Sequence, residues 1–327
     1  MRTRDMRIFA ICLMLVSALF LISCAGSFSS SPRGGERGSG RIPQPGSRGA
    51  GEPSITLYNK DTEKTEKMKI EKYLQGVVAG EMDPNWPEEA LAAQAIIART
   101  FTLKKILEGG VKEHKTDAST DEKEFQAYNA SEVNDKVRKA VDKTRGVVAT
   151  YNGQYINGWF HADAGGKTAA SALEGLEYKQ EKAPYIVSVT DPGYEKSPPE
   201  NKSWRAEFPI SVVRQKVQNW AGKDPGDISQ VDIIEKGPSG RITKVKLGDM
   251  TMSGPALRLA LGSEDMRSTL VSTLKIENNN LVVEGRGFGH GVGMSQWGAK
   301  AMADQGKTAK DIVNYFYKDI MIEKIWK

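Results

Sequence analysis

The sequence predicts an α+β fold, because helical and strand-like hydrophobic patterns alternate irregularly from Ser54 to the C-terminus. A long apolar helix is expected over residues 88–107, whereas short alternating strands gather in the second half of the chain. No internal repeat is visible. We therefore expect a mixed single domain over residues 54–327, with a mostly β inserted subdomain at about residues 200–283, called the insert region below.

Residues 1–24 are typical of an export signal. Arginines precede an uncharged apolar run, Ile8–Ile22, that is shorter than the roughly 20 residues of a membrane-spanning helix. The run ends in LISCA, which matches a bacterial lipobox, whose cysteine is lipidated and becomes the new N-terminus. We expect Cys24 to anchor the exported protein to the extracytoplasmic face of the cell membrane. An uncleaved membrane anchor with an incidental cysteine is the alternative.

Composition limits the chemistry of the exported part. The chain has two cysteines, Cys12 and Cys24, and both lie in the signal segment. No disulfide or thiolate metal site is therefore expected in residues 25–327. Residues 25–53 are rich in Gly, Ser, Pro and Arg, a composition that predicts a flexible spacer. The net charge of +5 is weak and scattered, which argues against nucleic acid as a partner.

The first half of the folded part is predicted to form a hairpin and two helices. Ile55–Tyr58 alternates like a strand, with Lys67–Ile70 as its partner. Residues 71–79 are helical and apolar, and Pro87 followed by two glutamates opens a second helix that runs to about Leu107. This second helix is apolar nearly all round, so it should be buried.

The later elements are shorter. Residues 117–129 are polar and predict a loop, and Ser131–Thr144 predicts an amphipathic helix. Asn152-Gly153 predicts a tight turn between two strands, and Thr308-x-x-Asp311 predicts a capping box. The strands expected are 147–151, 154–160, 231–235, 242–247, 273–277 and 281–284, and the further helices 209–220, 295–303 and 308–317.

Residues 285–299, GRGFGHGVGMSQWGA, alternate glycines with aromatic, charged and polar side chains. Glycine at every second position allows positive φ and a close approach of the backbone to a ligand. The dinucleotide pattern needs glycines at i, i+2 and i+5, and no starting glycine of the stretch satisfies it. Two Gly-Lys-Thr triplets also lack the glycine that a P-loop requires five residues earlier. We expect a ligand-facing loop followed by a helix.

The sequence gives little support for a catalytic metal site or a Ser–His–Asp triad. The three histidines, His114, His161 and His290, are far apart and show no HExxH spacing. A GxSxG elbow is also absent. His161 ends an apolar strand before the turn Gly165-Gly166, a common place for binding residues, although a tight turn with a capped histidine explains the pattern equally well.

Glu81 is the most informative carboxylate, because it follows the apolar sequence GVVAG at the end of a predicted buried helix. Apolar surroundings raise the pKa of a carboxyl, which keeps a general acid protonated near neutral pH. An ordinary surface glutamate at a helix end fits the sequence equally well. Gln94 and Arg99 interrupt the next helix, where we expect a polar pair inside the core; the arginine could also brace the loop that carries Glu81.

Four blocks together resemble the stage II sporulation protein D family and its amidase-enhancer relatives. The blocks are GVVAGEMDPNWPEEALAAQAIIARTF, FHADAGGKTAAS, APYIVSV and GFGHGVGMSQWGAKAMADQGKTAKDIVNYFY. They occur in the family's order, and the similarity spans about residues 54–327. Members are exported bacterial proteins that act on peptidoglycan. The sporulation members resemble lytic transglycosylases for glycan strands without stem peptides, used during engulfment.

The resemblance implies that Glu81 is the catalytic residue. It would protonate the leaving oxygen of a MurNAc–GlcNAc linkage and then accept the proton of the C6 hydroxyl, which closes a 1,6-anhydro ring without water. Because the nucleophile belongs to the sugar, no second carboxylate and no cofactor are required. Gln94 and Arg99 would support the site. The residues expected to line the glycan groove are His161, Gly165, Gly166, Lys167, His290, Ser295 and Gln296.

A second interpretation of the resemblance is a non-catalytic module that binds peptidoglycan and activates a separate N-acetylmuramoyl-L-alanine amidase. A structural scaffold is a weaker third one, because it gives no reason for a glutamate in apolar surroundings. Some family members carry a histidine and a cysteine pair before the "Q-Y" block. Here that segment is HKTDASTDEKEFQAY, without cysteine, so we expect no structural zinc. The lipobox also departs from members with an uncleaved membrane helix.

Overall fold

The computed structural model describes residues 42–47 and 49–327. The expected export signal, the lipidation site Cys24 and most of the expected spacer lie outside the described residues. Within the described part, no helix is long and apolar enough to cross a membrane. The fold is α+β, as predicted, with helices and strands intermixed along the chain and the strands divided among several small sheets.

Helices and strands alternate along the described chain. The helices are α1 (Ile70–Glu81), α2 (Glu88–Leu107), α3 (Asp135–Lys143), α4 (Ala172–Leu176), α5 (Pro199–Lys202), α6 (Ile210–Ala221), α7 (Gly254–Leu261), α8 (Gln296–Asp304) and α9 (Ala309–Phe316), with 3-10 turns η1 (Ala130–Glu132) and η2 (Tyr194–Lys196). The strands are β1 (Ser54–Asn59), β2 (Lys64–Lys69), β3 (Ala118–Ser119), β4 (Val147–Tyr151), β5 (Gln154–Tyr155), β6 (Phe160–His161), β7 (Trp204–Pro209), β8 (Val231–Lys236), β9 (Ile242–Leu247), β10 (Met250–Ser253), β11 (Val271–Glu277), β12 (Asn280–Gly285), β13 (Met294–Ser295) and β14 (Met321–Lys324).

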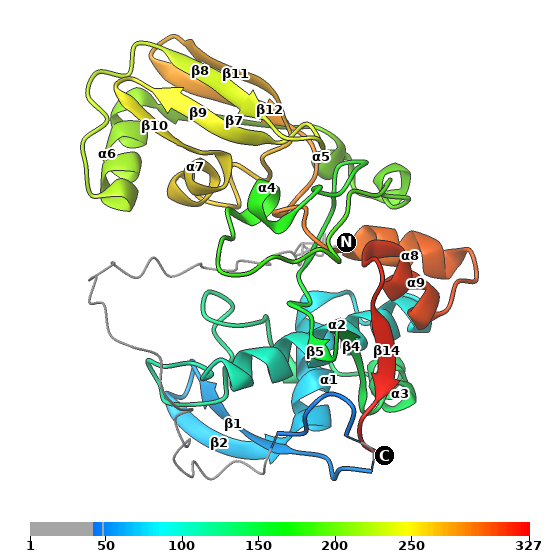
Figure 1. The fold of residues 1–327 in the computed structure, drawn as a ribbon. Coiled ribbons are helices and arrows are strands. Elements are labelled where there is room, and N and C mark those ends of the chain that lie inside the picture. The colour runs from blue at the N-terminus through cyan, green and yellow to red at the C-terminus, as the bar shows by residue number, and fades with distance from the viewer. Residues whose placement is uncertain (1–41, 48) are drawn as a thin grey trace, which may run out of the picture.

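Helix α2 is the centre of the larger hydrophobic cluster. As its apolar circumference predicts, the side chains from Ala90 to Leu103 are buried. Helices α1, α3, α8 and α9 and strand β4 all pack against it. The C-terminal strand β14 pairs antiparallel with β4, so the end of the chain packs into the larger cluster, as the lower part of Figure 1 shows.

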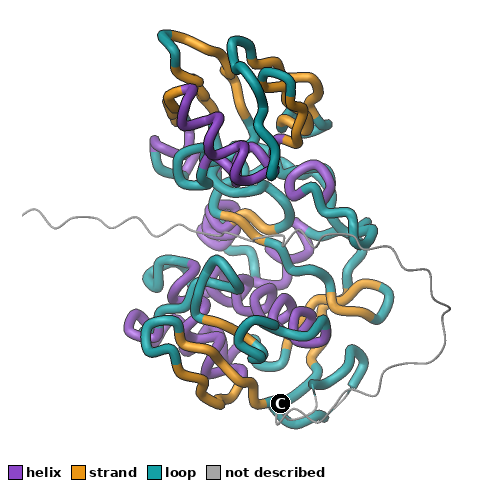
Figure 2. The backbone as a smooth tube through the Cα atoms, turned by 90° about the vertical axis from the view of Figure 1, so that its left-hand side faces the viewer, coloured by secondary structure: helices purple, strands orange, loops and turns teal. Residues whose placement is uncertain are grey.

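A second hydrophobic cluster lies within the insert region, between Trp204 and Val283. Its strands form two sheets, ordered β10-β9-β8 and β11-β12-β7, and α6 and α7 cover them. Figure 1 shows these elements gathered at the top of the molecule, and Figure 2 shows the same separation from the side. Whether the insert region is an independently folding unit stays a prediction.

Two sequence-based boundaries are wrong. The expected helix Ser131–Thr144 is interrupted, because the side chain of Asn134 accepts a hydrogen bond from Val137 N and caps the start of α3. The expected strand 154–160 is broken into β5 and β6, which belong to different sheets. Gly158 has a φ of 36° between them, and its close contact with the carbonyl of Ile97 leaves no room for a side chain.

A buried ion pair joins the first turn of α1 to α2. Arg99 has no exposed surface, and its guanidinium donates two hydrogen bonds to the carboxylate of Glu71, at 3.0 and 2.6 Å. The amide of Gly146 and the indole N–H of Trp326 donate to the same carboxylate, each at 2.9 Å. The pair therefore connects four segments that are distant in the sequence, and each charge has several partners.

We predict that Arg99→Met lowers the free energy of unfolding by about 3–5 kcal/mol, because it leaves the buried Glu71 carboxylate without its counter-charge. Urea denaturation measures the change. The matched control is Lys104→Met on the same helix, whose ion pairs with Glu108 and Glu181 are partly exposed, and whose cost should stay below about 1 kcal/mol. Equal costs for the two variants would contradict the role given to this pair.

Candidate active site

Glu81 is the last residue of α1, and only 7% of its surface is exposed. Burial raises the pKa of its carboxyl to about 8. Hydrogen bonds from the Ala127 amide and the Gln296 side chain favour the ionised form, but they offset only part of that effect. The carboxyl is therefore largely protonated at neutral pH, as expected of a general acid.

The Ala127 amide donates to Glu81 Oε1 at 2.8 Å. Because Oε1 accepts this N–H, the contact favours Oε2 as the oxygen that carries the proton of the neutral acid. Two glycines on one face of α1 make the contact possible. A side chain at Gly76 would overlap the ring of Tyr128, and a Cβ at Gly80 would lie 2.8 Å from the backbone of Ala127. The segment around Ala127 thus lies directly on the helix that carries the acid.

Gln296 and two tryptophans join the segment at the start of α8 to the end of α1. Gln296 Nε2 donates to the backbone carbonyl of Glu81 at 3.1 Å. The next residue, Trp297, packs against Trp86 of the turn after α1, with ring centroids 4.8 Å apart. Both indoles are half-buried and therefore retain exposed surface. Two segments far apart in the sequence therefore meet at the end of α1, through one hydrogen bond to the Glu81 backbone and one aromatic pair.

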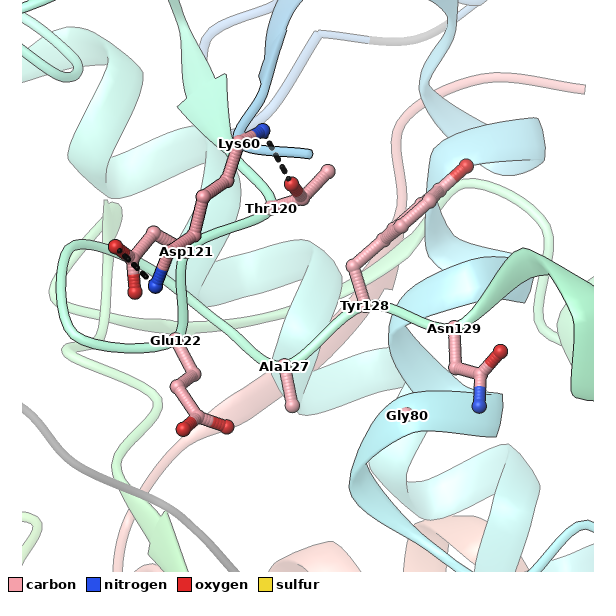
Figure 3. Close-up of a pocket in the computed structure, with 8 residues that line it drawn as sticks. All are labelled: Lys60, Gly80, Thr120, Asp121, Glu122, Ala127, Tyr128 and Asn129. Carbon is pink, nitrogen blue, oxygen red and sulfur yellow. Dashed lines mark hydrogen bonds and ion pairs between the residues drawn. The ribbon is translucent and has the colours of Figure 1, made fainter. Parts of the chain in front are cut away.

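A pocket of about 220 Å³ lies next to the end of α1, and Glu81 itself is not among its lining residues (Figure 3). Gly80 and Ala127 belong to its wall, and these residues flank the Glu81 carboxyl in sequence and through the hydrogen bond described above. The lining residues are Lys60, Gly80, Thr120, Asp121, Glu122, Ala127, Tyr128 and Asn129. The expected loop 117–129 therefore forms one side of the pocket.

His161 and His290 come together, with ring centroids 5.6 Å apart, although the sequence separates them widely. Both are buried, and their pKa values are lowered by that burial, to about 3 for His290 and well below the usual value for His161. Backbone groups of Val292 bind both rings: its carbonyl accepts from His161 Nδ1 (3.2 Å), and its amide donates to His290 Nδ1 (3.0 Å). These histidines are neutral and held in fixed tautomers.

Ser295 is also buried. Its hydroxyl donates to Asp191 Oδ2 at 2.8 Å, and it caps the first turn of α8. The amides of Ala164 and Gly193 donate to the same aspartate. Burial and the nearby Asp163 raise the pKa of Asp191 to about 6. Neither His161 nor Ser295 has exposed surface, and their expected place in a glycan groove stays a prediction.

The Gly165-Gly166 turn is built as the sequence suggests, with both glycines at positive φ, 69° and 99°. Gly165 is buried against Leu270 and the backbone of Arg286, whereas Gly166 keeps partial exposure beside Tyr194. Lys167 is exposed, and its ammonium donates to the carbonyl of Pro238 at 3.3 Å. Of this turn, Gly166 and Lys167 present surface to a ligand.

The expected polar pair of Gln94 and Arg99 is wrong. Arg99 binds Glu71, and the fully buried Gln94 side chain finds no hydrogen-bonding partner among the described residues. Arg99 supports the site through α1, because it holds the first turn of the helix whose last residue is Glu81.

The glycine-rich stretch makes its close approach to the protein itself. Strand β13 pairs in parallel with β6, and a side chain at Gly289 or Gly293 would collide with His161 or Trp159. Gly287, Gly289, Gly291 and Gly293 all have positive φ. The expected ligand-facing loop is therefore mainly a packing seam, and it delivers Gln296 and Trp297 to Glu81.

Comparison with known proteins finds relatives over most of the chain. A family model described as "Stage II sporulation protein" matches residues 58–151, which include Glu81, Ala127 and Arg99. Stage II sporulation protein D of Bacillus subtilis is 32% identical over 286 residues, covering 83% of this chain and 79% of that protein. The chain belongs to the stage II sporulation protein D family.

Two further relatives extend the family comparison. An uncharacterised protein of Brachyspira hyodysenteriae is 32% identical over 81% of this chain and 69% of its own length. A B. subtilis protein named amidase enhancer is 28% identical over 75% of this chain but only 39% of its own length. A second family model, "Domain of unknown function (DUF8618)", matches residues 170–293, which include the insert region.

Three contributors to the site were missed by sequence reasoning. Ala127 acts through its backbone amide, which no sequence pattern reveals. Trp86 and Trp297 lie in the blocks NWPEE and SQWGA, and their contact with each other appears only when the two blocks meet. The signal that was available is the pair Gly76 and Gly80 at i and i+4, which marks a helix face in close contact with another segment.

We predict that Glu81→Gln increases the free energy of unfolding, and that the gain grows as pH rises from about 4.5 to 8. The carboxyl has a folded-state pKa of about 8 against an ordinary value of 4.5, so in this range the unfolded chain releases a proton that the folded protein retains. Wild-type stability therefore falls with rising pH, by up to about 1.4 kcal/mol per unit from this group. Glutamine does not titrate.

Chemical denaturation at several pH values measures the difference between wild type and Glu81→Gln. Glu113→Gln, at an exposed glutamate, is the matched control for loss of a carboxyl. A stability difference that does not change with pH would contradict the burial of a neutral Glu81.

Proposed function

We propose that this protein is a peptidoglycan lytic transglycosylase in which Glu81 is the single acid and base. The observation that carries the proposal is the buried Glu81 carboxyl, protonated at neutral pH and bound by the amide of Ala127, a residue that lines a pocket. Membership of the stage II sporulation protein D family supports a sporulation-related role at the cell wall. The substrate proposed is the glycan strand, with its stem peptides removed.

The proposed reaction needs no water. The Glu81 proton passes to the glycosidic oxygen as the bond from that oxygen to the anomeric carbon of MurNAc breaks, and GlcNAc leaves with a hydroxyl. The C6 hydroxyl of the same MurNAc then bonds to the anomeric carbon and returns its proton to the Glu81 carboxylate. One bond breaks, one forms, and the enzyme ends in its starting protonation state. The Ala127 amide stabilises the carboxylate stage, since it donates to Oε1.

The half-exposed indoles of Trp86 and Trp297 are proposed to bind the sugar next to the scissile bond. Flat aromatic faces suit the apolar face of a pyranose ring, and this pair is held rigidly by its own packing. Gln296 would fix the backbone from which Glu81 projects. Of the groove residues expected from the sequence, Gly166 and Lys167 have the exposure that sugar contact requires.

We propose further that Cys24 is lipidated and anchors the protein to the extracytoplasmic face of a bacterial cell membrane. The lipobox LISCA supports the anchor. The Gly/Ser/Pro/Arg-rich segment 25–53 would then act as a spacer that lets the folded part reach the wall.

A second candidate function is favoured by one observation, the similarity to a protein named amidase enhancer. In that case the pocket binds peptidoglycan without cleaving it, and a separate amidase is the partner. The two functions differ in one measurable respect: only the transglycosylase releases 1,6-anhydro ends by itself.

We predict that the purified protein releases 1,6-anhydroMurNAc products from denuded glycan strands, and that Glu81→Gln lowers the rate by at least about a hundredfold, because the acid and the base are lost together. Mass spectrometry of the digests measures the products. The wild-type rate should fall as pH rises through about 8, where Glu81 loses its proton.

Glu113→Gln controls for the loss of a glutamate and should retain wild-type turnover. Equal product from wild type and Glu81→Gln would refute the role of Glu81. No product from the wild type, together with stimulation of an added amidase, would establish the enhancer function instead.

We predict that Trp297→Ala raises KM for denuded glycan roughly tenfold, equivalent to about 1.4 kcal/mol, while kcat changes less. The substitution removes the aromatic surface next to the acid and leaves the Glu81 carboxyl in place. Trp220→Ala, at an exposed tryptophan of α6, is the matched control and should leave KM unchanged. Similar KM values for wild type and Trp297→Ala would exclude a sugar platform at this position.

A further inference from the structure

Arg286 is an exposed cation without an anionic partner among the described residues. Its backbone is fixed at the end of β12, because its amide donates to the Leu270 carbonyl at 3.2 Å and its carbonyl accepts from Ser268 Oγ at 2.6 Å. Its guanidinium lies over the half-buried ring of Tyr194, 5.8 Å from the ring centroid. A guanidinium held over an aromatic face leaves the N–H donors at its edge open to a ligand.

The Gly165-Gly166 turn lies beside this guanidinium. A Cβ at Gly165 would lie 3.1 Å from the backbone of Arg286, and a Cβ at Gly166 would lie 3.7 Å from the Tyr194 ring. Lys167 follows in the sequence, is exposed and has no carboxylate partner within the described ranges. These contacts define one patch, called the cationic surface below, which consists of Gly166, Lys167, Tyr194 and Arg286.

The cationic surface adjoins Trp297, the aromatic side chain proposed above to bind sugar. The buried Asp191 carboxylate accepts from the amides of Ala164 and Gly193, at 3.0 and 2.9 Å. It also accepts from the Ser295 hydroxyl at 2.8 Å, so one carboxylate binds the glycine turn, the start of η2 and the start of α8. A Cβ at Gly193 would lie 2.2 Å from the Trp297 backbone, which places η2 in direct contact with α8.

The neighbouring charged groups do not pair with this surface. The buried Arg241 guanidinium donates to two carbonyls that flank the glycine turn and adds a second positive charge there. Asp163 and Asp191 are buried and bound by backbone amides. On η2, Glu195 and Lys196 are exposed and opposite in charge. Four further charged side chains in this part of the molecule are two of each sign: Glu174, Glu200, Lys202 and Arg267.

We propose that Arg286, together with Lys167 and the Tyr194 ring, binds the lactyl carboxylate of MurNAc and thereby selects glycan strands without stem peptides. The inference rests on the proposed function. Hydrolysis of the amide that links a stem peptide to MurNAc leaves a free carboxylate on the lactyl group, whereas an intact stem peptide leaves a neutral amide at that position. A guanidinium donates two parallel, charge-assisted hydrogen bonds to a carboxylate, and an amide carbonyl cannot accept both.

This recognition is separate from the chemistry. MurNAc alternates with GlcNAc, so a lactyl carboxylate recurs at every second sugar of a denuded strand. A strand whose sugar rests on Trp297 extends over the adjoining cationic surface, where Arg286 binds a carboxylate outside the cleaved linkage. Arg286 is therefore a specificity-determining residue. Because its side chain is exposed and contacts only an aromatic face, Arg286→Gln should fold normally.

A binding experiment tests the proposal without turnover. The full-length protein carrying Glu81→Gln is titrated calorimetrically with denuded glycan strands, and with the same strands after their lactyl carboxylates are converted to N-methyl amides. The carboxylate strands should bind about tenfold more tightly, and this preference should shrink at high salt. Adding Arg286→Gln should abolish the preference, whereas Arg286→Lys should keep part of it. Arg138→Gln, at an exposed arginine of α3, is the matched control and should keep all of it.

Turnover gives a second readout. With Glu81 intact, Arg286→Gln should raise KM for denuded glycan about tenfold with little change in kcat, and amidation of the strands should add nothing further. If no 1,6-anhydro product forms but the binding preference depends on Arg286, the transglycosylase proposal fails and the recognition stands. Equal binding of carboxylate and amide strands, or an unchanged preference in Arg286→Gln, overturns the role of Arg286. Tighter binding of a polyglycerol phosphate than of denuded glycan also overturns it, because the surface would then fit a different wall polymer.

Discussion

The Glu71–Arg99 ion pair is the interaction on which the candidate site depends. It binds the first turn of α1 to the buried helix α2, and the Gly146 amide and the Trp326 indole complete it. The ion pair therefore fixes the position and direction of helix α1, and with them the position of its last residue, Glu81. The same helix carries two buried glutamates with opposite environments: Glu71 meets a guanidinium, whereas Glu81 meets an amide and apolar side chains. The first carboxyl is paired with a buried cation, and burial raises the pKa of the second.

The second constraint is the contact between α1 and the segment at Ala127. Gly76 and Gly80 remove two side chains from the helix, and glycine within a helix costs about 1 kcal/mol relative to alanine. In exchange, the Ala127 amide reaches Glu81, and the loop that precedes it brings Glu122 to the pocket. The site is therefore destabilised twice, by helix glycines and by a buried carboxyl. Such local costs are common where a protein performs chemistry.

Sequence periodicity predicted the elements that are decided by local pattern. The buried helix α2, the capping box at Thr308 and Asp311 and the strand β9 lie where the sequence places them. The failures occur where a distant partner decides. Gly158 breaks a strand because the carbonyl of Ile97 lies against it, and Arg99 chooses Glu71 over Gln94 because α1 crosses α2 at that level. Neither partner can be identified from a local window of sequence.

The functional prediction also succeeded where local sequence decides and failed where a distant contact decides. The apolar context of Glu81 was local, so the sequence could predict its burial and raised pKa, whereas its role as the acid stays a prediction. The glycine-rich stretch was misjudged, because alternation of glycine with large side chains shows that a backbone makes a close contact, but not with what. Here the contact is with residues 159–164, and the stretch directly follows the insert region in the sequence. The pairing of β13 with β6 must keep its register, because a shift would break the hydrogen bond from Gln296 to the Glu81 carbonyl. The buried, neutral histidines stabilise the same contact. His161 and His290 bind the carbonyl and the amide of one residue, Val292, and so fix the glycine-rich stretch against β6.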